Sequence, residues 1–359
     1  MLTRSTDRGF HWSTPVRVSD GSGSYQWPVP AVGPNGEVYV AWCGPSSIRF
    51  DLSTNGGTTW GTDRTVQSYY SQSRNLKGGQ ILTFSYPAMD VDITAGPYNG
   101  YIYIAYMDNG PDGFPDMYFT RSTDRGQTWS ARRRINDDPL NNRIDQFHPW
   151  LTVDKTGCIS VIFYDSRLDP SNILCDVYLT QSTDGGNTWS SNIRVTTVSS
   201  DLRLDKDLSL EPLDPSKPLA GQFAGWIGEY NGVAATSWRN VVPIWTDTRN
   251  GNQDTYVGVY TGSGIKEEIV QSIRSNLLVI PNPVYDHLLI SFNVKNSDNY
   301  EISLFDGLGR KVDTVFNGYL KEGSQRIKIN KLRRLPKGVY FIILKGKDFV
   351  SQQKFILAN

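Results

Sequence analysis

Apolar and polar positions follow a repeating plan over residues 1–262. One unit contains four short apolar segments separated by turn residues: 149–153, 158–164, 177–181 and 192–196. β-Branched and aromatic residues dominate these segments, and Gly, Asn or Pro lies between them, which is typical of buried β-strands. Equivalent second strands occur elsewhere, at 38–42, 101–106 and 241–245. The pattern predicts an all-β fold made of repeated four-stranded units.

A polar turn motif follows the third strand of most units. Its pattern is S-x-D/N-x-G-x-T-W, with His in place of Thr in the first copy, and the copies recur 48 to 69 residues apart. The acidic or amide residues of the four copies are Asp7, Asn55, Asp124 and Asp184, and their tryptophans are Trp12, Trp60, Trp129 and Trp189. An Asp or Asn side chain accepts hydrogen bonds from N–H groups of its own turn, and Gly supplies the positive φ that closes it. We therefore predict hairpins between third and fourth strands, all on one rim, with the last three tryptophans largely buried between units.

The motif resembles the Asp box of sialidases and other BNR-repeat β-propellers. The resemblance implies four-stranded blades around a common axis, with the boxes on the rim opposite the substrate face. It therefore implies a structural role for the motif, and the chemistry belongs to other residues. On this basis residues 1–262 are expected to form a β-propeller.

The number of blades is open at this level. Three units have all four strands, the unit ending at Gly262 lacks a fourth strand and a turn motif, and the N-terminal piece lacks its first two strands. Strand 15–19 is able to complete the last unit and close a four-bladed ring. Because the sialidase family is six-bladed, we favour a partial propeller and expect the chain to be a fragment that begins inside a repeat.

The composition changes after Gly264. Residues 263–275 form a polar linker, and residues 276–359 have the alternation and short turns of a small Ig-like antiparallel β-sandwich. Three signatures occur in order: P-N-P-V at 281–284, D-x-x-G-R at 306–310 and L-P-x-G-V-Y at 335–340. Together they resemble the C-terminal sorting domain of the type IX secretion system. The resemblance implies export in a Bacteroidota-type bacterium, to the medium or to the outer-membrane surface, with the type IX machinery as partner; an ordinary accessory module is the alternative.

Charge and cysteine content exclude several classes of function. The chain has 36 basic and 36 acidic residues, so nothing favours nucleic acid or an anionic membrane as a partner. No apolar run approaches the roughly 20 residues of a membrane-spanning helix. The three cysteines, Cys43, Cys158 and Cys175, are expected to be free, mostly buried thiols without a zinc site.

Candidate site residues lie in loops on the side opposite the turn motifs. Asp165 and Arg167 occupy the same repeat position as Asp247 and Arg249. The sialidase resemblance implies three arginines that bind the substrate carboxylate, since guanidinium groups contact carboxylates in bidentate fashion. The arginine motif that precedes the first box in that family has no counterpart in this chain. We therefore treat the four residues as candidate substrate-binding residues, with a salt bridge inside each blade as the alternative.

The catalytic candidates are the adjacent pair Glu229 and Tyr230, because sialidases use a Tyr nucleophile next to a Glu. Neighbouring strand residues point to opposite faces, which counts against the pair. His148, which precedes a proline, is expected to be a packed entry-loop residue. No cofactor is expected, although the clustered loop aspartates are candidates for Ca²⁺ through their oxygens.

Two classes of function remain open from the residues. One is an exported sialidase-like glycoside hydrolase, and the other is a noncatalytic propeller that binds a glycan or a glycoprotein at the cell surface.

Overall fold

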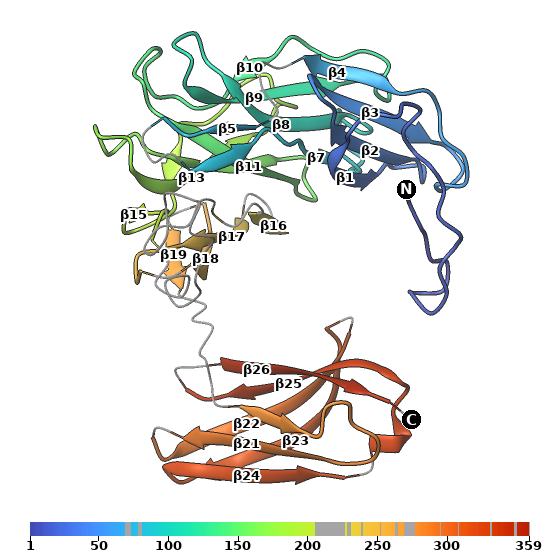
Figure 1. Ribbon diagram of the computed structural model, residues 1–359, viewed down its shortest axis with the longest axis vertical. Coiled ribbons are helices and arrows are strands. Elements are labelled where there is room, and N and C mark those ends of the chain that lie inside the picture. Colours follow the sequence, from blue (N-terminus) through green and yellow to red (C-terminus); the bar gives the residue numbers. More distant parts are fainter. Residues whose placement is uncertain are drawn as a thin grey trace, which may run out of the picture. The chain divides into compact units, whose positions relative to one another are not determined.

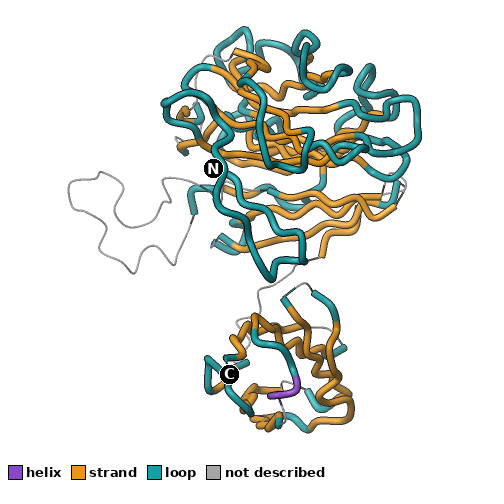
Figure 2. Tube along the Cα trace, turned by 90° about the vertical axis from the view of Figure 1, so that its right-hand side faces the viewer, coloured by secondary structure: helices purple, strands orange, loops and turns teal. Residues whose placement is uncertain are grey.

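The computed structural model is an all-β chain that divides into two compact units, Met1–Ile269 and Val270–Asn359. Figures 1 and 2 show strands and loops throughout both units, with one short helix in the second. The structure describes residues 1–359 apart from 69–72, 78–80, 205–226, 228–230, 238–239, 252, 263–264, 269–276, 295, 308, 331, 348–349 and 359. The division falls seven residues beyond the expected end of the first domain at Gly262, and the expected linker lies largely outside the described residues.

Three complete four-stranded antiparallel sheets form the larger part of the first unit. The first sheet contains β1 (Gln26–Val32), β2 (Val38–Cys43), β3 (Ser47–Ser53) and β4 (Arg64–Ser68). The second contains β7 (Ala88–Val91), β8 (Ile102–Asn109), β9 (Pro115–Ser122) and β10 (Arg133–Arg134). The third contains β11 (Gln146–Val153), β12 (Ile159–Asp165), β13 (Leu174–Ser182) and β14 (Ile193–Arg194). In each sheet the strands are hydrogen-bonded in chain order, as expected for consecutive hairpins.

A fourth sheet corrects one expectation. It consists of β16 (Gly232–Ser237), β17 (Asn240–Asp247), β18 (Asp254–Tyr260) and β19 (Ile265–Glu268), in that order. The sequence predicts that this unit ends at Gly262 without a fourth strand, because residues 265–268 are largely polar and no turn motif precedes them. The backbone pairing of β19 with β18 overrides that weak side-chain pattern.

The remaining short strands connect or extend these sheets. A small hairpin of β5 (Ser73–Asn75) and β6 (Leu82–Phe84) lies between the first two sheets in the chain, and β15 (Ser200–Asp201) pairs with β13. The N-terminal segment is closed by a bridge between Leu2 and Val16. Val16 belongs to segment 15–19, which the sequence offers as the strand that closes a ring. In the structure it pairs with Leu2 of the same N-terminal segment.

Three of the four turn motifs lie between a third and a fourth strand, as the sequence predicts, and the first copy does not. Three copies connect β3 to β4, β9 to β10, and β13 to β14, and the first copy lies inside the loop closed by Leu2 and Val16. In the third copy the Thr128 amide donates to Asp124 Oδ1 at 2.9 Å, and the Gly126 amide donates to Ser122 Oγ at 2.8 Å. The Thr188 amide makes the equivalent bond to Asp184 at 2.8 Å. These bonds satisfy the amides of a tight turn, which is why the same polar residues recur.

The turn motifs also hold neighbouring sheets together. A Cβ on Gly126 would lie 2.1 Å from Phe50 of the preceding sheet, and a Cβ on Gly186 would lie 2.4 Å from Phe119. Both glycines have positive φ, of 77° and 86°. The absence of a side chain therefore serves two purposes, because it permits the left-handed backbone and lets the turn sit directly on an aromatic ring.

The motif tryptophans are less buried than the sequence analysis expected. Trp60, Trp129 and Trp189 are half-buried, and Trp12 remains 63% exposed. Trp129 contacts Phe50 edge-on at a centroid distance of 5.3 Å, and Trp189 contacts Phe119 in the same way at 4.9 Å. The indoles stay partly exposed because the motifs lie at the ends of the sheets, where an indole packs on a neighbouring ring without being enclosed by the core.

Buried thiols complete the first unit. Cys43, Cys158 and Cys175 are all buried thiols that form no disulfide, as predicted. Cys158 lies next to the Ile159–Ser182 pair at one end of β12 and β13, and Cys175 lies next to the Asp165–Asp176 pair at the other. Within the described part of the chain, no helix has the length and apolarity needed to cross a membrane.

The second unit has its own hydrophobic core between two antiparallel sheets. One sheet has the order β20 (Leu278–Ile280), β21 (Leu288–Val294), β24 (Gly323–Ile329). The other has the order β23 (Lys311–Leu320), β22 (Asp298–Asp306), β25 (Gly338–Lys345), β26 (Val350–Leu357), and the short 3-10 helix η2 (Leu332–Arg334) precedes β25. Residues of both sheets, including Ile290 and Ile342, belong to one buried cluster. The Ig-like description of this arrangement stays a prediction.

Candidate functional site

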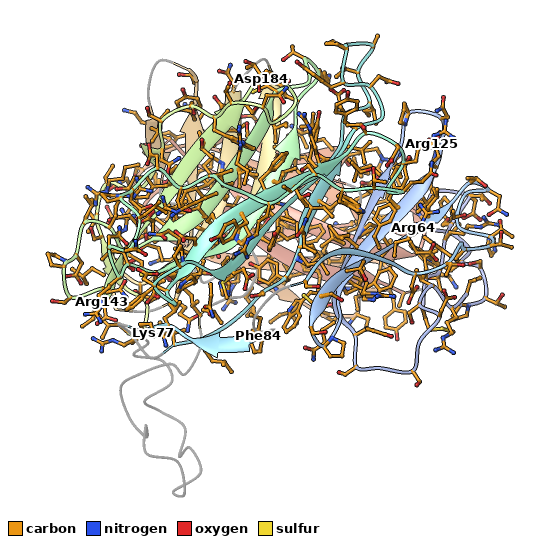
Figure 3. All side chains as sticks on the ribbon, turned by 90° about the horizontal axis from the view of Figure 1, so that it is seen from above. Arg64, Lys77, Phe84, Arg125, Arg143 and Asp184 are labelled. Atoms are coloured by element: carbon orange, nitrogen blue, oxygen red, sulfur yellow. The ribbon has the colours of Figure 1, made fainter. Side chains whose placement is uncertain are left out.

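The loops opposite the turn motifs carry a repeated pair of aspartates. In the second, third and fourth sheets the pairs Asp108–Asp116, Asp165–Asp176 and Asp247–Asp254 lie directly opposite each other at the ends of the second and third strands. The serines that start the turn motifs pair at the other ends, as Ser182 does with Ile159. Figure 3 shows the motif residues Arg125 and Asp184 toward one side of the first unit, and Lys77, Phe84 and Arg143 toward the opposite side. We call the side opposite the motifs the loop rim.

Arg167 is held by carboxylates of its own and the preceding sheet. Its Nη2 lies 2.7 Å from Asp165 Oδ2, and its Nη1 lies 2.5 Å from Asp137 Oδ1. The guanidinium also stacks over the Tyr178 ring, 4.4 Å from the centroid. Only 15% of the Arg167 side chain is exposed, and the Asp165 side chain is completely buried. Burial raises the pKa of Asp165 to about 6, although Arg167 opposes that rise.

The same arrangement recurs around two further arginines. Arg249 Nη2 lies 2.7 Å from Asp247 Oδ2, and its guanidinium lies 4.3 Å from the Tyr256 centroid, with 10% of its side chain exposed. Arg132 Nη1 lies 2.8 Å from Asp108 Oδ2, and its guanidinium lies 4.4 Å from the Tyr118 centroid. The second, third and fourth sheets thus each contain an Asp–Arg–Tyr triplet. In each triplet the N–H groups of the guanidinium contact the Asp carboxylate, and its flat face stacks on the Tyr ring.

A buried polar network joins the second and third sheets near these triplets. Asn136 Nδ2 lies 2.7 Å from Asp116 Oδ1, 2.7 Å from Asp138 Oδ1 and 2.9 Å from Gln146 Oε1. Arg134 Nη2 adds a contact of 2.9 Å to Asp138 Oδ1. All of these groups except Arg134 are buried. A network of this kind rigidifies the loop rim, because each group is held by several partners at low local dielectric.

His148 is completely buried at the start of β11, as the packed-residue expectation requires. It has a positive φ of 49°, and its ring lies 5.4 Å from that of Tyr86. Among the described residues, neither ring nitrogen has a hydrogen-bond partner. Burial lowers the pKa of His148 to about 3, so the ring stays neutral at physiological pH.

Two exposed cations lie on the loop rim, on the same side of the first unit as a half-buried aromatic pair (Figure 3). Lys77 and Arg143 are exposed, and the rings of Trp27 and Phe84 are 4.7 Å apart. The Lys77 amide donates to Asp145 Oδ2 at 2.9 Å, which ties the β5–β6 hairpin to the loop that carries Arg143. Backbone contacts therefore position both cations, while their side chains face solvent.

Arg143 itself is placed by a neighbouring loop. Its amide donates to Asp112 Oδ2 at 3.0 Å, and its φ of 62° turns the chain sharply at this point. Asp145 is in turn held by Asn172, whose Nδ2 lies 2.7 Å from Asp145 Oδ2. Amide–carboxylate contacts thus fix the backbone of the loop rim at Lys77 and Arg143 and leave the two basic side chains exposed.

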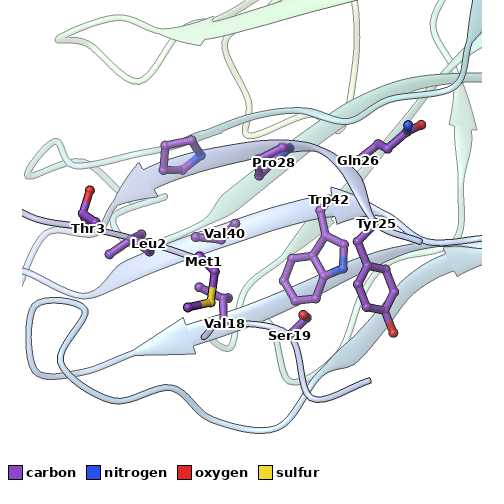
Figure 4. A pocket seen from close by; sticks show the side chains of 11 residues that line it. Met1, Leu2, Thr3, Val18, Ser19, Tyr25, Gln26, Pro28, Val40 and Trp42 are labelled. Atoms are coloured by element: carbon purple, nitrogen blue, oxygen red, sulfur yellow. The ribbon is translucent and has the colours of Figure 1, made fainter. Parts of the chain in front are cut away.

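An apolar pocket lies elsewhere, between the N-terminal segment and the first sheet (Figure 4). Its volume is about 410 Å³, and its lining includes Leu2, Val18, Val40 and Trp42. None of the described residues that line it has a charged side chain. The pocket therefore does not offer the ionic groups that the loop rim has.

The catalytic pair and the possible metal ligands are the remaining candidates. Glu229 and Tyr230 lie outside the described residues, so their catalytic role stays a prediction. Over the described ranges, no group of three or more His, Cys, Asp or Glu side chains has the arrangement to hold a metal ion.

Sequence reasoning missed part of this arrangement. The tyrosines of the triplets belong to a D-x-Y pattern that the sequence repeats at 116–118, 176–178 and 254–256. That pattern was a usable signal for the stacked tyrosines. Arg132 has no comparable signal, because it comes from the segment before the fourth strand, whereas Arg167 and Arg249 follow the second. The importance of Lys77 was also hidden, because its hairpin is an insertion outside the repeat.

Comparisons with known proteins address the second unit most directly. Residues 278–358 match the family described as "Secretion system C-terminal sorting domain". This match confirms the predicted sorting domain, which is a type IX secretion signal. The protein is therefore secreted or attached to the outer-membrane surface.

Solved structures similar to the chain include several carbohydrate-active enzymes. The GH93 α-L-arabinofuranosidase of Fusarium graminearum is 13% identical, with 94% of this chain and 96% of that chain covered and a TM-score of 0.42. The endo-arabinase of Bacteroides thetaiotaomicron is 15% identical, with coverages of 86% and 94% and a TM-score of 0.38. The NanB sialidase of Streptococcus pneumoniae is 9% identical, with coverages of 96% and 70% and a TM-score of 0.42. At these TM-scores and identities we infer no activity for this chain from the similarity. No curated protein matches its sequence.

Proposed function

We propose that the first unit is an Asp-box β-propeller that binds acidic glycans on its loop rim outside the cell. The observation that carries the proposal is the placement of Lys77 and Arg143, two exposed cations on the same side as the Trp27–Phe84 pair. Aromatic rings stack on the apolar faces of sugars, and basic side chains pair with sugar carboxylates. The four turn motifs and the four-stranded sheets support the propeller assignment.

The substrate-binding residues that the sequence predicts have a structural role in this proposal. Arg167 and Arg249 already pair with Asp165 and Asp247, and their guanidiniums are mostly buried. Removing such a charge from its partner to grip a ligand would leave a buried carboxylate without its counter-ion. In the proposal these four residues shape the loop rim, and the exposed cations contact the ligand.

The binding role is favoured over hydrolysis for the same reason. A sialidase-like mechanism requires several arginines that converge on one carboxylate, and the two arginines at the equivalent repeat positions, Arg167 and Arg249, have other partners. Glu229 and Tyr230 are kept as the catalytic prediction that an activity assay tests.

The experiment is a binding titration of the full chain with an acidic oligosaccharide, such as sialyllactose or oligogalacturonate, and with neutral lactose. Arg143→Asn should weaken acidic-glycan binding at least tenfold, and Lys77→Ala should do the same. Arg125→Asn is the matched control, because Arg125 is also an exposed arginine with a φ near 60° but lies on the opposite side. Asn tolerates this backbone conformation, so both variants should fold.

The outcomes separate the alternatives. Equal weakening by Arg143→Asn and Arg125→Asn indicates unspecific charge attraction and contradicts a site on the loop rim. Absence of binding to every glycan tested refutes the proposal. Turnover of a fluorogenic sialoside that Glu229→Gln abolishes would instead establish the enzyme.

A further inference from the structure

Two buried carboxylates face each other in the first sheet. β3 and β4 are in antiparallel register through the pair Phe50–Arg64, and one step further along this register sets Asp51 opposite Asp63. Asp51 is 2% exposed, and the Asp63 side chain is 4% exposed. Directly opposite residues have Cβ atoms only about 5 Å apart, and like charges in that position are destabilising. An arrangement that is both buried and repulsive needs a compensating group.

Neither carboxylate is fully satisfied by the protein. Within the described part of the chain, Asp51 Oδ2 and Asp63 Oδ1 are buried and have no hydrogen-bond partner. Burial raises the pKa of both groups, and the charges of Asp63 and Asp20 add to the rise at Asp51. Arg49 lies beside the pair, but its Nη2 is 4.0 Å from Asp63 Oδ2 and so approaches the oxygen other than the unpartnered Oδ1. An unsatisfied buried carboxylate oxygen is costly, so these two oxygens indicate a missing partner.

The second and third sheets, here called the sister sheets, have a different residue at the position of Asp51. Asp51 lies two residues before the serine of its turn motif, where the second and third sheets have Thr120 and Thr180. Thr120 Oγ1 donates to the Ser130 carbonyl at 2.8 Å, and Thr180 Oγ1 donates to the Ser190 carbonyl at 2.9 Å.

The first sheet has a carboxylate in place of that hydroxyl donor. Asp51 faces Gly61, the counterpart of Ser130 and Ser190, and a Cβ on Gly61 would lie 2.9 Å from Asp51 Oδ1. The residue opposite also differs, because Asp63 stands where the sister sheets have Arg132 and Asn192. Side chains that can donate hydrogen bonds are thus replaced by carboxylates at two facing positions of the repeat.

We infer that Asp51 and Asp63 together bind a divalent cation of the calcium type at the outer edge of the first sheet. The ligands are the two unpartnered carboxylate oxygens, completed by backbone oxygens and water. Ca²⁺ suits this set because it takes oxygen ligands in irregular geometry, whereas Mg²⁺ requires a near-ideal octahedron. The ion is distinct from the loop rim, and its binding is independent of glycan binding.

The cation would also attach the N-terminal segment to the first sheet. The Asp63 amide donates to Asp20 Oδ2 at 2.8 Å, so Asp20 brings a third negative charge to this place. Neutralising Asp51 and Asp63 relieves the repulsion that acts on Asp20. Because the protein is exported, weak binding in the range of extracellular modules, about 0.1–1 mM, is sufficient.

The test is a thermal melt of the full chain after EDTA treatment, with and without CaCl₂, followed by tryptophan fluorescence. All ten tryptophans lie in the first unit, so the signal reports that unit. CaCl₂ at 10 mM should raise Tm by roughly 2–6 °C, with MgCl₂ giving less than half of the effect. The double variant Asp51→Thr with Asp63→Asn reproduces the Thr180 and Asn192 pair, so it should fold and lose the calcium response.

A second variant locates the ion. Asp112→Asn removes a carboxylate from the loop rim and should keep the calcium response. A response lost in Asp112→Asn but kept in the double variant places the ion on the loop rim and overturns the proposal. A wild type that does not respond to calcium but gains stability when the pH is lowered to 5 shows that the pair shares a proton, which also overturns it.

Discussion

Replacing Gly186 by alanine tests whether the turn motifs hold neighbouring sheets together. Gly186 has a φ of 86°, and a Cβ at this position would lie 2.4 Å from Phe119 Cε1 of the preceding sheet. That ring also receives Trp189 at a centroid distance of 4.9 Å. The added methyl group therefore meets a strained backbone and a packed aromatic contact at once.

The cost of the backbone strain and the cost of the overpacking are estimated separately. A left-handed backbone costs an L-residue about 1–2 kcal/mol, and overpacking costs about 1–3 kcal/mol. The free energy of unfolding should therefore fall by about 2–5 kcal/mol in Gly186→Ala. Gly36 provides the control, because it has the same φ of 86° and open space around its Cβ position. Gly36→Ala should cost only the backbone part, about 1–2 kcal/mol.

Urea unfolding followed by tryptophan fluorescence measures both variants. Equal losses in Gly186→Ala and Gly36→Ala, within about 0.5 kcal/mol, would refute the contact between the motif and Phe119. A double-mutant cycle adds a direct check, because Phe119→Leu opens space for the new methyl group. The cycle should give a favourable coupling energy of about 1–3 kcal/mol.

Two further predictions use the same assay. The unfolded His148 imidazole takes up a proton below pH 6.5 and the folded one only near pH 3, so stability should fall by roughly 1.4 kcal/mol per pH unit on acidification between these values. His148→Asn, which tolerates the positive φ, should remove that part of the slope; an unchanged slope contradicts the burial. Trp129→Ala should cost about 3 kcal/mol, the low end for aromatic truncation, because the side chain is half-buried. Exposed Trp12 is the control, and a loss below about 1 kcal/mol for Trp129 would count against its contact with Phe50.

The sequence determined the features whose physical cause is local. Strands such as β12 and β17 follow from the alternation and β-branching of a few consecutive residues. The turn motifs follow from bonds that span only two to four residues, such as the Thr128 amide to Asp124. The sorting domain was identifiable because its signatures lie at turns between short strands. Strand β19 was not predicted, because backbone pairing with β18 and not its side-chain pattern makes it a strand.

The tertiary structure decided which groups meet across strands and sheets. Whether Arg167 faces a ligand or Asp165 depends on how its loop folds back, and its contact with Asp137 joins residues 30 positions apart. Trp129 is half-buried because it packs against a cluster that includes Phe50 of another sheet. The opposition of Asp51 and Asp63 depends on the register between β3 and β4, and a shift of one residue would turn either side chain to the other face. Contacts of this kind carry no local pattern, so only the assembled sheets reveal them.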